Sequence, residues 1–162
     1  MFLLRDYQPE YADQVNSIAI KAFQQFEGSY SDWDDFIQGV GNMSKLSRSG
    51  EIIVAELDGE IVGAVCYIGP NIKKSYFPTE SPCIRMLVVD PDARGMGIGR
   101  ALTQECIDRA KRDQAPHIGL HTSPVMNVAL PLYLRMGFKK DADIEPIRGV
   151  PYATYYKDLR GL

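Results

Sequence analysis

The feature that most restricts the fold of this chain is an apolar strand that leads through a glycine-rich turn into a helix. The strand is predicted over residues 83–89, where apolar side chains are nearly continuous, so it needs cover on both faces. Gly95, Gly97 and Gly99 follow, and a helical pattern of apolar residues starts at Ile98. A sheet covered on both faces by helices is an α/β arrangement, which this segment therefore predicts.

Local patterns predict the other strands. The dipeptide Asp58-Gly59 joins two apolar segments and suits a two-residue hairpin turn with positive φ at both positions. The predicted strands cover residues 3–7, 51–57, 60–68, 83–89 and 116–122, and two stretches around 141–149, of which the second runs over about 152–159.

Four helices are predicted from three- and four-residue apolar spacing and from capping residues. The first runs from Pro9 to Gly28, and the third starts at Ile98. For the second helix, Ser31 and the residue three positions later form a capping box. For the fourth, Ser123 is the predicted cap of a segment that ends near Met136, and Pro131 kinks this segment or delays its regular start.

The order of these elements predicts one α/β domain over residues 1–162. Helices alternate with strands only in the second half of the chain, so the central sheet is expected to be mixed and mostly antiparallel. We predict about seven strands in this sheet and about four helices on its faces. No internal repeat or linker interrupts the pattern.

Composition excludes several classes of protein. Eighteen Lys and Arg against 21 Asp and Glu give a net charge of −3, which offers no global reason to bind nucleic acid or an anionic membrane. No apolar run approaches the roughly 20 residues of a membrane span, and the start reaches charge at Arg5 too soon for a secretory signal. Cys66, Cys83 and Cys106 are expected to be free buried thiols in the cytoplasm, and no metal site is expected.

The closely spaced glycines predict a phosphate site. Such a turn lets a ligand approach bare backbone N–H groups, and the first turn of the following helix adds its positive dipole end. A tight turn that needs glycine only for positive φ is the alternative. The dinucleotide fingerprint and the P-loop pattern both fail, because Arg100 stands where the third glycine belongs and no Gly-Lys pair occurs. Arg94-x-x-Gly97-x-Gly99 is the pattern that is present.

Two segments resemble signatures of the GNAT superfamily of N-acetyltransferases. Residues 87–102 (LVVDPDARGMGIGRAL) resemble its acetyl-CoA-binding signature, and residues 129–138 (ALPLYLRMGF) are similar to its A-x-x-x-Y-x-x-x-G-F segment. The element order agrees, so the resemblance covers nearly the whole chain. It implies a GNAT-like fold and transfer of an acetyl group from acetyl-CoA to a primary amine of a small molecule or peptide. Dimers are frequent in the family, so the resemblance leaves a homodimer open.

The resemblance also implies the residues that bind the cosubstrate. The backbone of residues 87–89 would pair with the pantetheine arm, a backbone N–H near Leu87 would face the thioester oxygen, and the glycine turn would wrap the pyrophosphate. The implied residues are Leu87, Val88, Val89, Arg94, Gly95, Met96, Gly97, Ile98, Gly99, Arg100 and Asn127. Many members carry an asparagine where this chain has Met126, so Asn127 either reaches the ligand or caps a helix. The alternative for Arg94 and Arg100 is that they are surface arginines with no phosphate partner.

Two residues are candidates for proton transfer. Tyr133 occupies the position of the family's general acid, where a phenol can protonate a leaving thiolate; its alternative is packing in the core. His121 lies where some relatives carry an acidic residue, and an imidazole with a pKa of about 6.5 can act as a base near neutral pH. The alternative for His121 is a structural bond to a backbone carbonyl. Glu80 is a further candidate base, with solvent exposure as its alternative.

No cysteine or serine has a nearby histidine in a nucleophile arrangement, so direct attack by the amine in a ternary complex is expected. Acidic and aromatic residues between the first two helices could receive a cationic amine, or could simply favour a helix N-terminus and the core. They are Phe26, Glu27, Tyr30, Asp32, Trp33, Asp34 and Asp35. A non-catalytic acyl-CoA-binding or regulatory module on the same fold is the rival hypothesis. A phosphate-loop protein for free nucleotides is the third.

Overall fold

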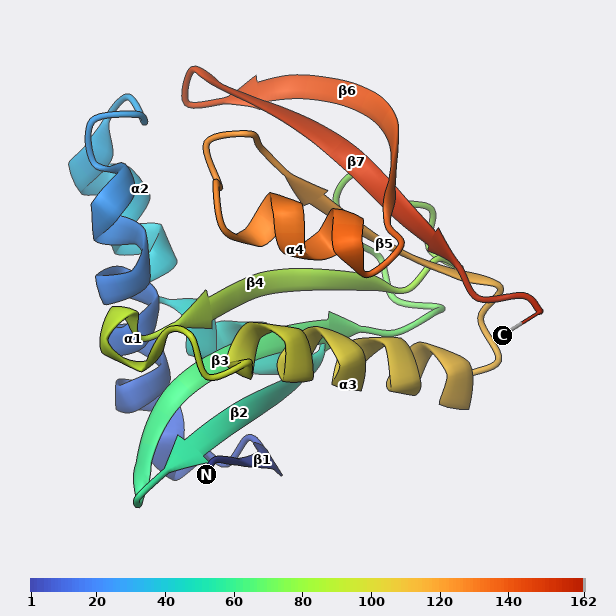
Figure 1. The fold of residues 1–162 in the computed structure, drawn as a ribbon. Helices are drawn as coiled ribbons and strands as arrows, with labels where there is room; N and C mark the ends of the chain where they lie inside the picture. Colours follow the sequence, from blue (N-terminus) through green and yellow to red (C-terminus); the bar gives the residue numbers. More distant parts are fainter. Residues whose placement is uncertain (162) are drawn as a thin grey trace.

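A single seven-stranded sheet forms the centre of the molecule (Figure 1). The computed structural model describes residues 1–161. Across the sheet the strand order is β1-β2-β3-β4-β5-β7-β6, and every neighbouring pair is antiparallel except β4 and β5. The strands are β1 Leu3–Asp6, β2 Glu51–Leu57, β3 Glu60–Ile68, β4 Cys83–Val89, β5 His117–Thr122, β6 Lys139–Ile147 and β7 Val150–Asp158. The predicted mixed and mostly antiparallel sheet is confirmed.

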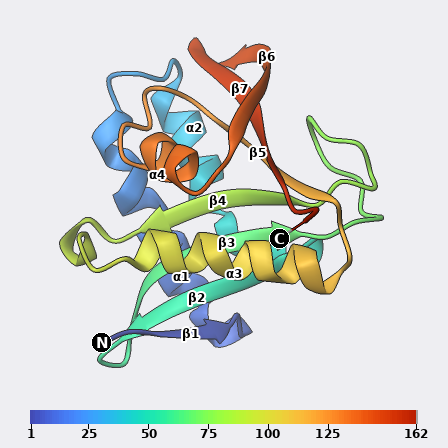
Figure 2. The ribbon, with the colours of Figure 1, turned by 45° about the vertical axis from the view of Figure 1, so that its right-hand side comes forward.

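Helices cover both faces of this sheet (Figures 1 and 2). One face carries α1 and α2, and the other carries α3 and α4, so each strand of the centre has two buried faces. On β2, for example, Ile53 packs on the α3 side and the adjacent Ile52 packs on the α1 side. The α-helices are α1 Ala12–Phe23, α2 Trp33–Val40, α3 Ile98–Arg112 and α4 Ala129–Arg135. Short 3₁₀ turns are Pro9–Tyr11, Gln24–Phe26, Met43–Arg48 and Pro91–Ala93.

The sheet opens between β4 and β5. Their parallel pairing is confined to Cys83 and Gly119, and beyond that point the two strands diverge (Figure 1). A β-bulge lies on the same part of β4, where Met86 and Leu87 are together opposite the single residue Val65 of β3. Met86 has a φ of 60°, which is unusual for a side-chain-bearing residue inside a strand. The end of β4 therefore carries a residue with no partner in the sheet, next to an opening.

Two helix starts differ from the sequence prediction. Asp32, with a φ of 50°, occupies the N-cap of α2 and makes no side-chain capping bond, because the chain enters this helix through a contact with the far hairpin: Ser31 N–H donates to the carbonyl of Arg148. The predicted capping box at Ser31 is therefore wrong. Ser123 does not cap α4, which begins at Ala129. Pro131 is in the first turn of that helix, so its predicted effect of delaying the regular start is confirmed.

The last hairpin is longer than predicted. Strand β6 continues to Ile147, and only Arg148 and Gly149 form the turn, with φ values of 47° and 82°. Two residues with positive φ are the geometry of a tight hairpin turn, whereas the sequence pattern suggested a wider loop over 141–149. The Asp58-Gly59 turn has the predicted positive φ values of 51° and 84°.

The three cysteines are free and buried, as predicted. In residues 1–161, no helix has both the length and the apolar character that crossing a bilayer requires.

Candidate functional site

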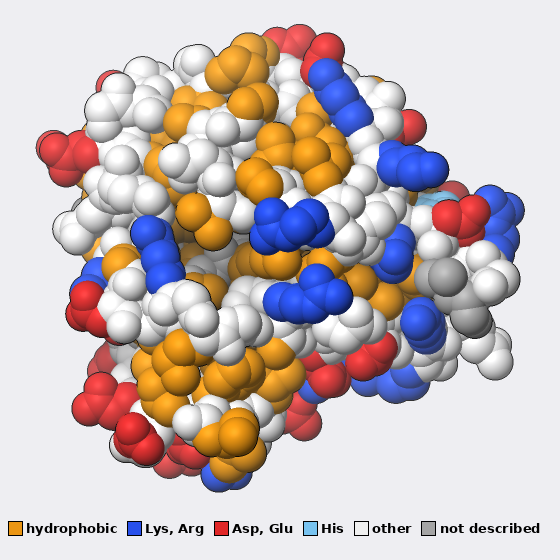
Figure 3. Space-filling model, in the orientation of Figure 1, with side chains coloured by type: hydrophobic (Ala, Val, Ile, Leu, Met, Phe, Trp, Pro, Cys, Tyr) orange, Lys and Arg blue, Asp and Glu red, His pale blue; other side chains and the backbone are white. Residues whose placement is uncertain are grey.

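A cavity of about 560 Å³ lies where the end of β4 meets α1, α4 and the start of α3. In the space-filling view the surface is hollowed near the centre of this face, between Lys and Arg side chains (Figure 3). The cavity is bounded by the bulged part of β4, the glycine turn and residues 126–129, which follow β5 and begin α4. A concave site at the separated end of a strand can hold an extended ligand against unpaired backbone groups.

Most of the residues predicted to bind the cosubstrate line this cavity. They are Leu87, Val88, Val89, Arg94, Gly95, Gly97, Ile98, Gly99, Arg100 and Asn127. Met96 is outside the lining, because its side chain is 41% exposed between two glycines of the turn. Tyr133 and His121 are also outside the lining. Asn127 does not cap α4, since Val128 occupies that position.

The backbone of the glycine turn is open to a ligand. Within the part of the chain that the structure describes, no backbone N–H group from residue 95 to residue 100 donates a hydrogen bond. Gly97 caps α3 with a φ of 81°, and a side chain added there would meet no atom within 4 Å. The first N–H groups of α3 and its positive dipole end therefore point to the same exposed position, which suits an anion.

An ion pair fixes the turn that precedes the glycines. The Asp90 carboxylate accepts a hydrogen bond from the backbone N–H of Asp92 at 2.9 Å. Lys21 of α1 lies 3.1 Å from Asp90 and 3.0 Å from Asp92. These contacts link the loop after β4 to α1 on the other side of the cavity. They therefore hold the turn that carries the free N–H groups in place.

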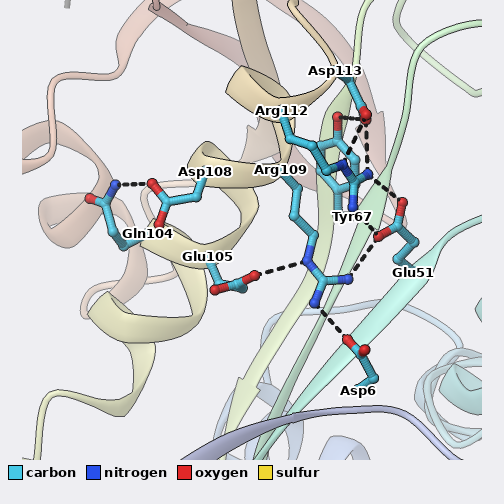
Figure 4. Close-up of polar contacts among 9 residues, drawn as sticks. All are labelled: Asp6, Glu51, Tyr67, Gln104, Glu105, Asp108, Arg109, Arg112 and Asp113. Carbon is cyan, nitrogen blue, oxygen red and sulfur yellow. Dashed lines mark hydrogen bonds and ion pairs between the residues drawn. The ribbon is translucent and has the colours of Figure 1, made fainter.

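Arg94, Arg100 and Arg135 line the cavity, and none of the three forms an ion pair with residues 1–161. The arginines at the far end of α3 are different (Figure 4). There, Arg109 contacts three carboxylates and Arg112 contacts two. Three unpaired guanidinium groups around the open turn provide charge for a ligand with several negative charges.

Tyr133 is buried in the core cluster under α3 and α4. Its ring packs edge-on against Phe138 at 5.8 Å, and burial raises the pKa of the phenol well above its usual range, so the hydroxyl stays protonated at neutral pH. Within the described residues, the Tyr133 hydroxyl takes part in no hydrogen bond. The ring therefore packs in the core as the alternative states, and the role of Tyr133 as an acid stays a prediction.

His121 lies on the opposite face of β5 from Tyr133. Its ring packs 4.7 Å from Tyr76 and 5.7 Å from Tyr152, between centroids. Burial, and secondarily the charge of Arg85, lower the pKa of His121 to about 4, so the imidazole is neutral at pH 7. His117 on the same strand is held by Ser81 at 2.9 Å, whereas His121 forms no side-chain hydrogen bond within the described residues. The carbonyl-bound alternative for His121 is therefore wrong.

A match to a protein-family model includes the residues of this site. The model for the "Acetyltransferase (GNAT) family" matches residues 11–138, which include the glycine turn and α4. This chain belongs to the GNAT family. The match confirms the resemblance that the two sequence segments indicated.

The GNAT chain is also similar to curated acetyltransferases. An uncharacterised N-acetyltransferase of Methanocaldococcus jannaschii is 27% identical over 142 residues, 86% of this chain. N-acetyltransferase 8B of Mus musculus is 34% identical over 54% of this chain, and mycothiol acetyltransferase of Cellulomonas flavigena is 32% identical over 62% of it. The match spans only 61%, 37% and 30% of the lengths of these three relatives, respectively.

Solved structures share the fold of this GNAT chain. A GNAT-family acetyltransferase of Staphylococcus aureus superposes with a TM-score of 0.76 at 20% identity, covering 99% of this chain and 100% of that one. The PaiA N-acetyltransferase of Thermoplasma acidophilum, solved in complex with coenzyme A, has a TM-score of 0.79 at 16% identity, with 98% and 99% of the two chains covered. At these identities the comparison establishes the fold.

Several lining residues were not among the predicted cosubstrate-binding residues. They are Ala22, Phe23, Gln25, Phe26, Ala93, Met126, Val128, Ala129, Leu132 and Arg135. Helical spacing could have indicated part of this set, because Leu132 and Arg135 are three residues apart on one face of α4. The residues of α1 gave no such signal, since their contact with β4 depends on the packing of the whole sheet.

The predicted acidic and aromatic cluster is divided among several roles. Phe26 lines the cavity, Tyr30 is buried and stacks on Phe36 at 4.1 Å, and Asp35 pairs with Arg148. The Tyr30 hydroxyl is hydrogen-bonded to that of Tyr152. The cluster therefore links α2 to the β6–β7 hairpin. Glu80 is exposed on the loop before β4.

Proposed function

We propose that this chain transfers an acetyl group from acetyl-CoA to a primary amine, with residues 1–162 acting as one domain in the cytoplasm. The observation that carries the proposal is the cavity between the end of β4 and the start of α3, where free backbone N–H groups and three unpaired arginines meet. Two further observations support it. Relatives with up to 34% identity are named N-acetyltransferases, and a structural neighbour was solved with coenzyme A.

The shape and chemistry of the cavity fit coenzyme A. The N–H groups of residues 95–100 would hold the pyrophosphate, and the arginines would neutralise phosphate charge. The amides of the pantetheine arm need hydrogen-bonding groups on a strand edge, and the bulged end of β4 at residues 86–89 offers them. Asn127, which lines the cavity, is available for a side-chain contact with this arm.

Acetyl-CoA would supply an activated acetyl thioester. The backbone N–H of Leu87, beside the bulge, would donate to the developing oxyanion. Tyr133, whose hydroxyl is protonated before the reaction, would donate a hydrogen bond or its phenolic proton to the leaving sulfur. His121 is unprotonated at pH 7 and would accept the proton that the ammonium group must lose, directly or through water; its pKa of about 4 makes it a weaker base than the ordinary imidazole of the sequence prediction. Much of the rate would come from holding the two reactants together.

A turnover assay tests the proposal. Release of free thiol from acetyl-CoA is measured against a panel of primary amines, with wild-type protein and with Tyr133→Phe. We expect Tyr133→Phe to lower kcat by on the order of 10²-fold while the affinity for coenzyme A stays unchanged, because only a proton donor to sulfur is lost.

Tyr155→Phe is the matched control, since Tyr155 is a buried tyrosine of the same core cluster on β7 and is not among the cavity residues. It should retain wild-type kcat. Binding of coenzyme A without turnover of any amine would contradict the enzymatic proposal and favour a binding module. Tight ATP binding without coenzyme A binding would contradict the site itself.

A further inference from the structure

We propose that the acceptor is a small amino acid-like molecule and that Arg85 binds the carboxylate beside its amine. This inference rests on the proposed acetyl transfer and deepens it by assigning the acceptor class. The observation behind it is an unpaired, half-buried arginine on the side of the opening away from α3 and α4. The cavity described above does not include this residue.

The register of the sheet places Arg85 and His121 at corresponding positions of β4 and β5. Cys83 on β4 and Gly119 on β5 are the registered pair, so Arg85 and His121 are each two residues farther along two diverging parallel strands. Residues two apart in a strand share a face. Cys83 packs in the cluster under α1, so both Arg85 and His121 are on this face, and the charge of Arg85 acts on the His121 ring.

Arg85 has no carboxylate partner. It forms neither an ion pair nor a side-chain hydrogen bond with residues 1–161. Two other partly buried arginines differ from it in this respect, because Arg109 contacts Asp6, Glu51 and Glu105, and Arg148 contacts Asp35. A guanidinium group that has lost part of its water without gaining an anion is unfavourable, so a bound anion would compensate it. One planar guanidinium group matches one carboxylate in charge and in two-pronged geometry.

The surroundings of Arg85 suit the rest of a small acceptor. The exposed Tyr76 packs on the His121 ring, and the buried Tyr152 also lies close to it, so aromatic side chains surround the imidazole on the face that carries Arg85. Leu87, whose N–H would face the reacting carbonyl, follows Arg85 by two residues across the bulge at Met86, so at most roughly 7 Å of chain separates them. A carboxylate held by Arg85 can thus belong to the molecule whose amine reacts at Leu87, if only a few bonds separate the two groups.

This placement distinguishes free amino acids from peptide N-termini. In a peptide, the carboxyl group next to the reacting amine is an amide and carries no charge. The Arg85 site would therefore favour an amino acid over its carboxamide and over the decarboxylated amine. The carboxyl group also changes the pKa of the neighbouring amine, so kcat/KM for each compound is referred to the concentration of its unprotonated amine.

The experiment compares acids with their amides on two proteins. Values of kcat/KM are measured for a panel of amino acids, their carboxamides and their decarboxylated amines, with wild-type protein and Arg85→Gln. We expect wild-type protein to prefer the acids by roughly 10- to 150-fold, the range of a charge-assisted contact, and Arg85→Gln to lose this preference. The acid-to-amide ratio is compared within each protein, because the charge of Arg85 also acts on His121 and its loss affects both substrates alike. Arg5→Gln, on the distant edge strand β1, is the matched control and should keep the preference.

Other outcomes are equally decisive. Equal turnover of acids and amides by wild-type protein, or a preference that survives in Arg85→Gln, would overturn the inference and leave acetyl transfer intact. If no amine is acetylated, the proposed function fails, and binding of N-acetylated amino acids to the coenzyme A-loaded protein decides the role of Arg85. Weaker binding by Arg85→Gln than by wild type would support the carboxylate site, and equal or absent binding would overturn it.

Discussion

The two ends of helix α3 use arginine in opposite ways. Near the C-terminal end, Arg109 and Arg112 are surrounded by carboxylates (Figure 4). Near the N-terminal end, Arg94 and Arg100 have no acidic partner and border the cavity together with Arg135 of α4. The same side chain therefore stabilises the fold at one end, whereas at the other end its charge is left for a ligand. Whether an arginine is paired with a carboxylate therefore distinguishes a structural arginine from one that is available to a ligand.

The paired end connects distant parts of the chain. Arg109, whose side chain is only 15% exposed, reaches Asp6 of β1 at 2.6 Å, Glu51 of β2 at 2.7 Å and Glu105 of its own helix at 3.0 Å. The hydroxyl of the buried Tyr67 on β3 donates to Asp113 just after the helix at 2.8 Å. Arg112 bridges Glu51 and Asp113 (Figure 4). This network fastens α3 to three strands of the sheet.

The largest effect should follow from removing the unpaired charges. We expect the combined variant Arg94→Gln, Arg100→Gln and Arg135→Gln to bind coenzyme A on the order of 10²- to 10³-fold more weakly, because each charge-assisted phosphate contact contributes about 1 kcal/mol or more. Isothermal titration calorimetry measures this affinity. Thermal stability should change little, since these side chains have no partner in the described chain.

A charge-matched control separates local contacts from net charge. Arg5, Arg48 and Arg160 are exposed arginines outside the cavity lining, and changing all three to glutamine removes the same three charges. This control should bind coenzyme A as wild type does. Equal weakening in both triple variants would mean that the cavity arginines act only through overall charge.

A smaller effect, on stability, is expected at the paired end. Arg109→Gln should lower the free energy of unfolding by about 2 kcal/mol, because three carboxylates lose a shared and partly buried partner; solvent screening keeps the loss below the sum of three pairs. Urea denaturation measures it. The affinity of the folded protein for coenzyme A should not change. A loss below about 0.5 kcal/mol would mean that the network is no more than a set of surface pairs.

The smallest effect compares two glycines with the same backbone geometry. Gly97 in the ligand turn and Gly59 in the remote hairpin have φ values of 81° and 84°, and neither has an atom within 4 Å of an added Cβ. Alanine at either position should therefore cost about 1 kcal/mol of stability through backbone strain alone. Only Gly97→Ala should also weaken coenzyme A binding, by roughly fivefold to tenfold, because a methyl group would stand where the ligand approaches. Calorimetry with both variants would contradict this if their affinities were equal.

Much of the fold could be predicted from local sequence. The Asp58-Gly59 hairpin and the strand–turn–helix segment at 83–112 depend on neighbouring residues, so their patterns were sufficient. The cap of α2 was predicted wrongly because a distant carbonyl, that of Arg148, takes the N–H of Ser31. The extent of the last hairpin was likewise decided by its pairing, which the sequence pattern does not contain.

The site, like the fold, has parts that local sequence predicts and parts that it does not. Its loop residues were predicted because glycine spacing and the family signature are local. The opening between β4 and β5 and the bulge at Met86 arise from register between strands, which no local pattern encodes. Arg85 was not predicted as a functional residue for this reason: within an apolar strand, the sequence does not show which face it takes or whether an acid lies opposite.

The most direct test of the account is a crystal structure of the protein with coenzyme A. The account predicts that the pyrophosphate lies against the N–H groups of residues 95–100 and that the sulfur lies between β4 and β5, within hydrogen-bond distance of the Tyr133 hydroxyl. Coenzyme A bound away from the glycine turn, or a sulfur that the Tyr133 hydroxyl cannot reach, would contradict it.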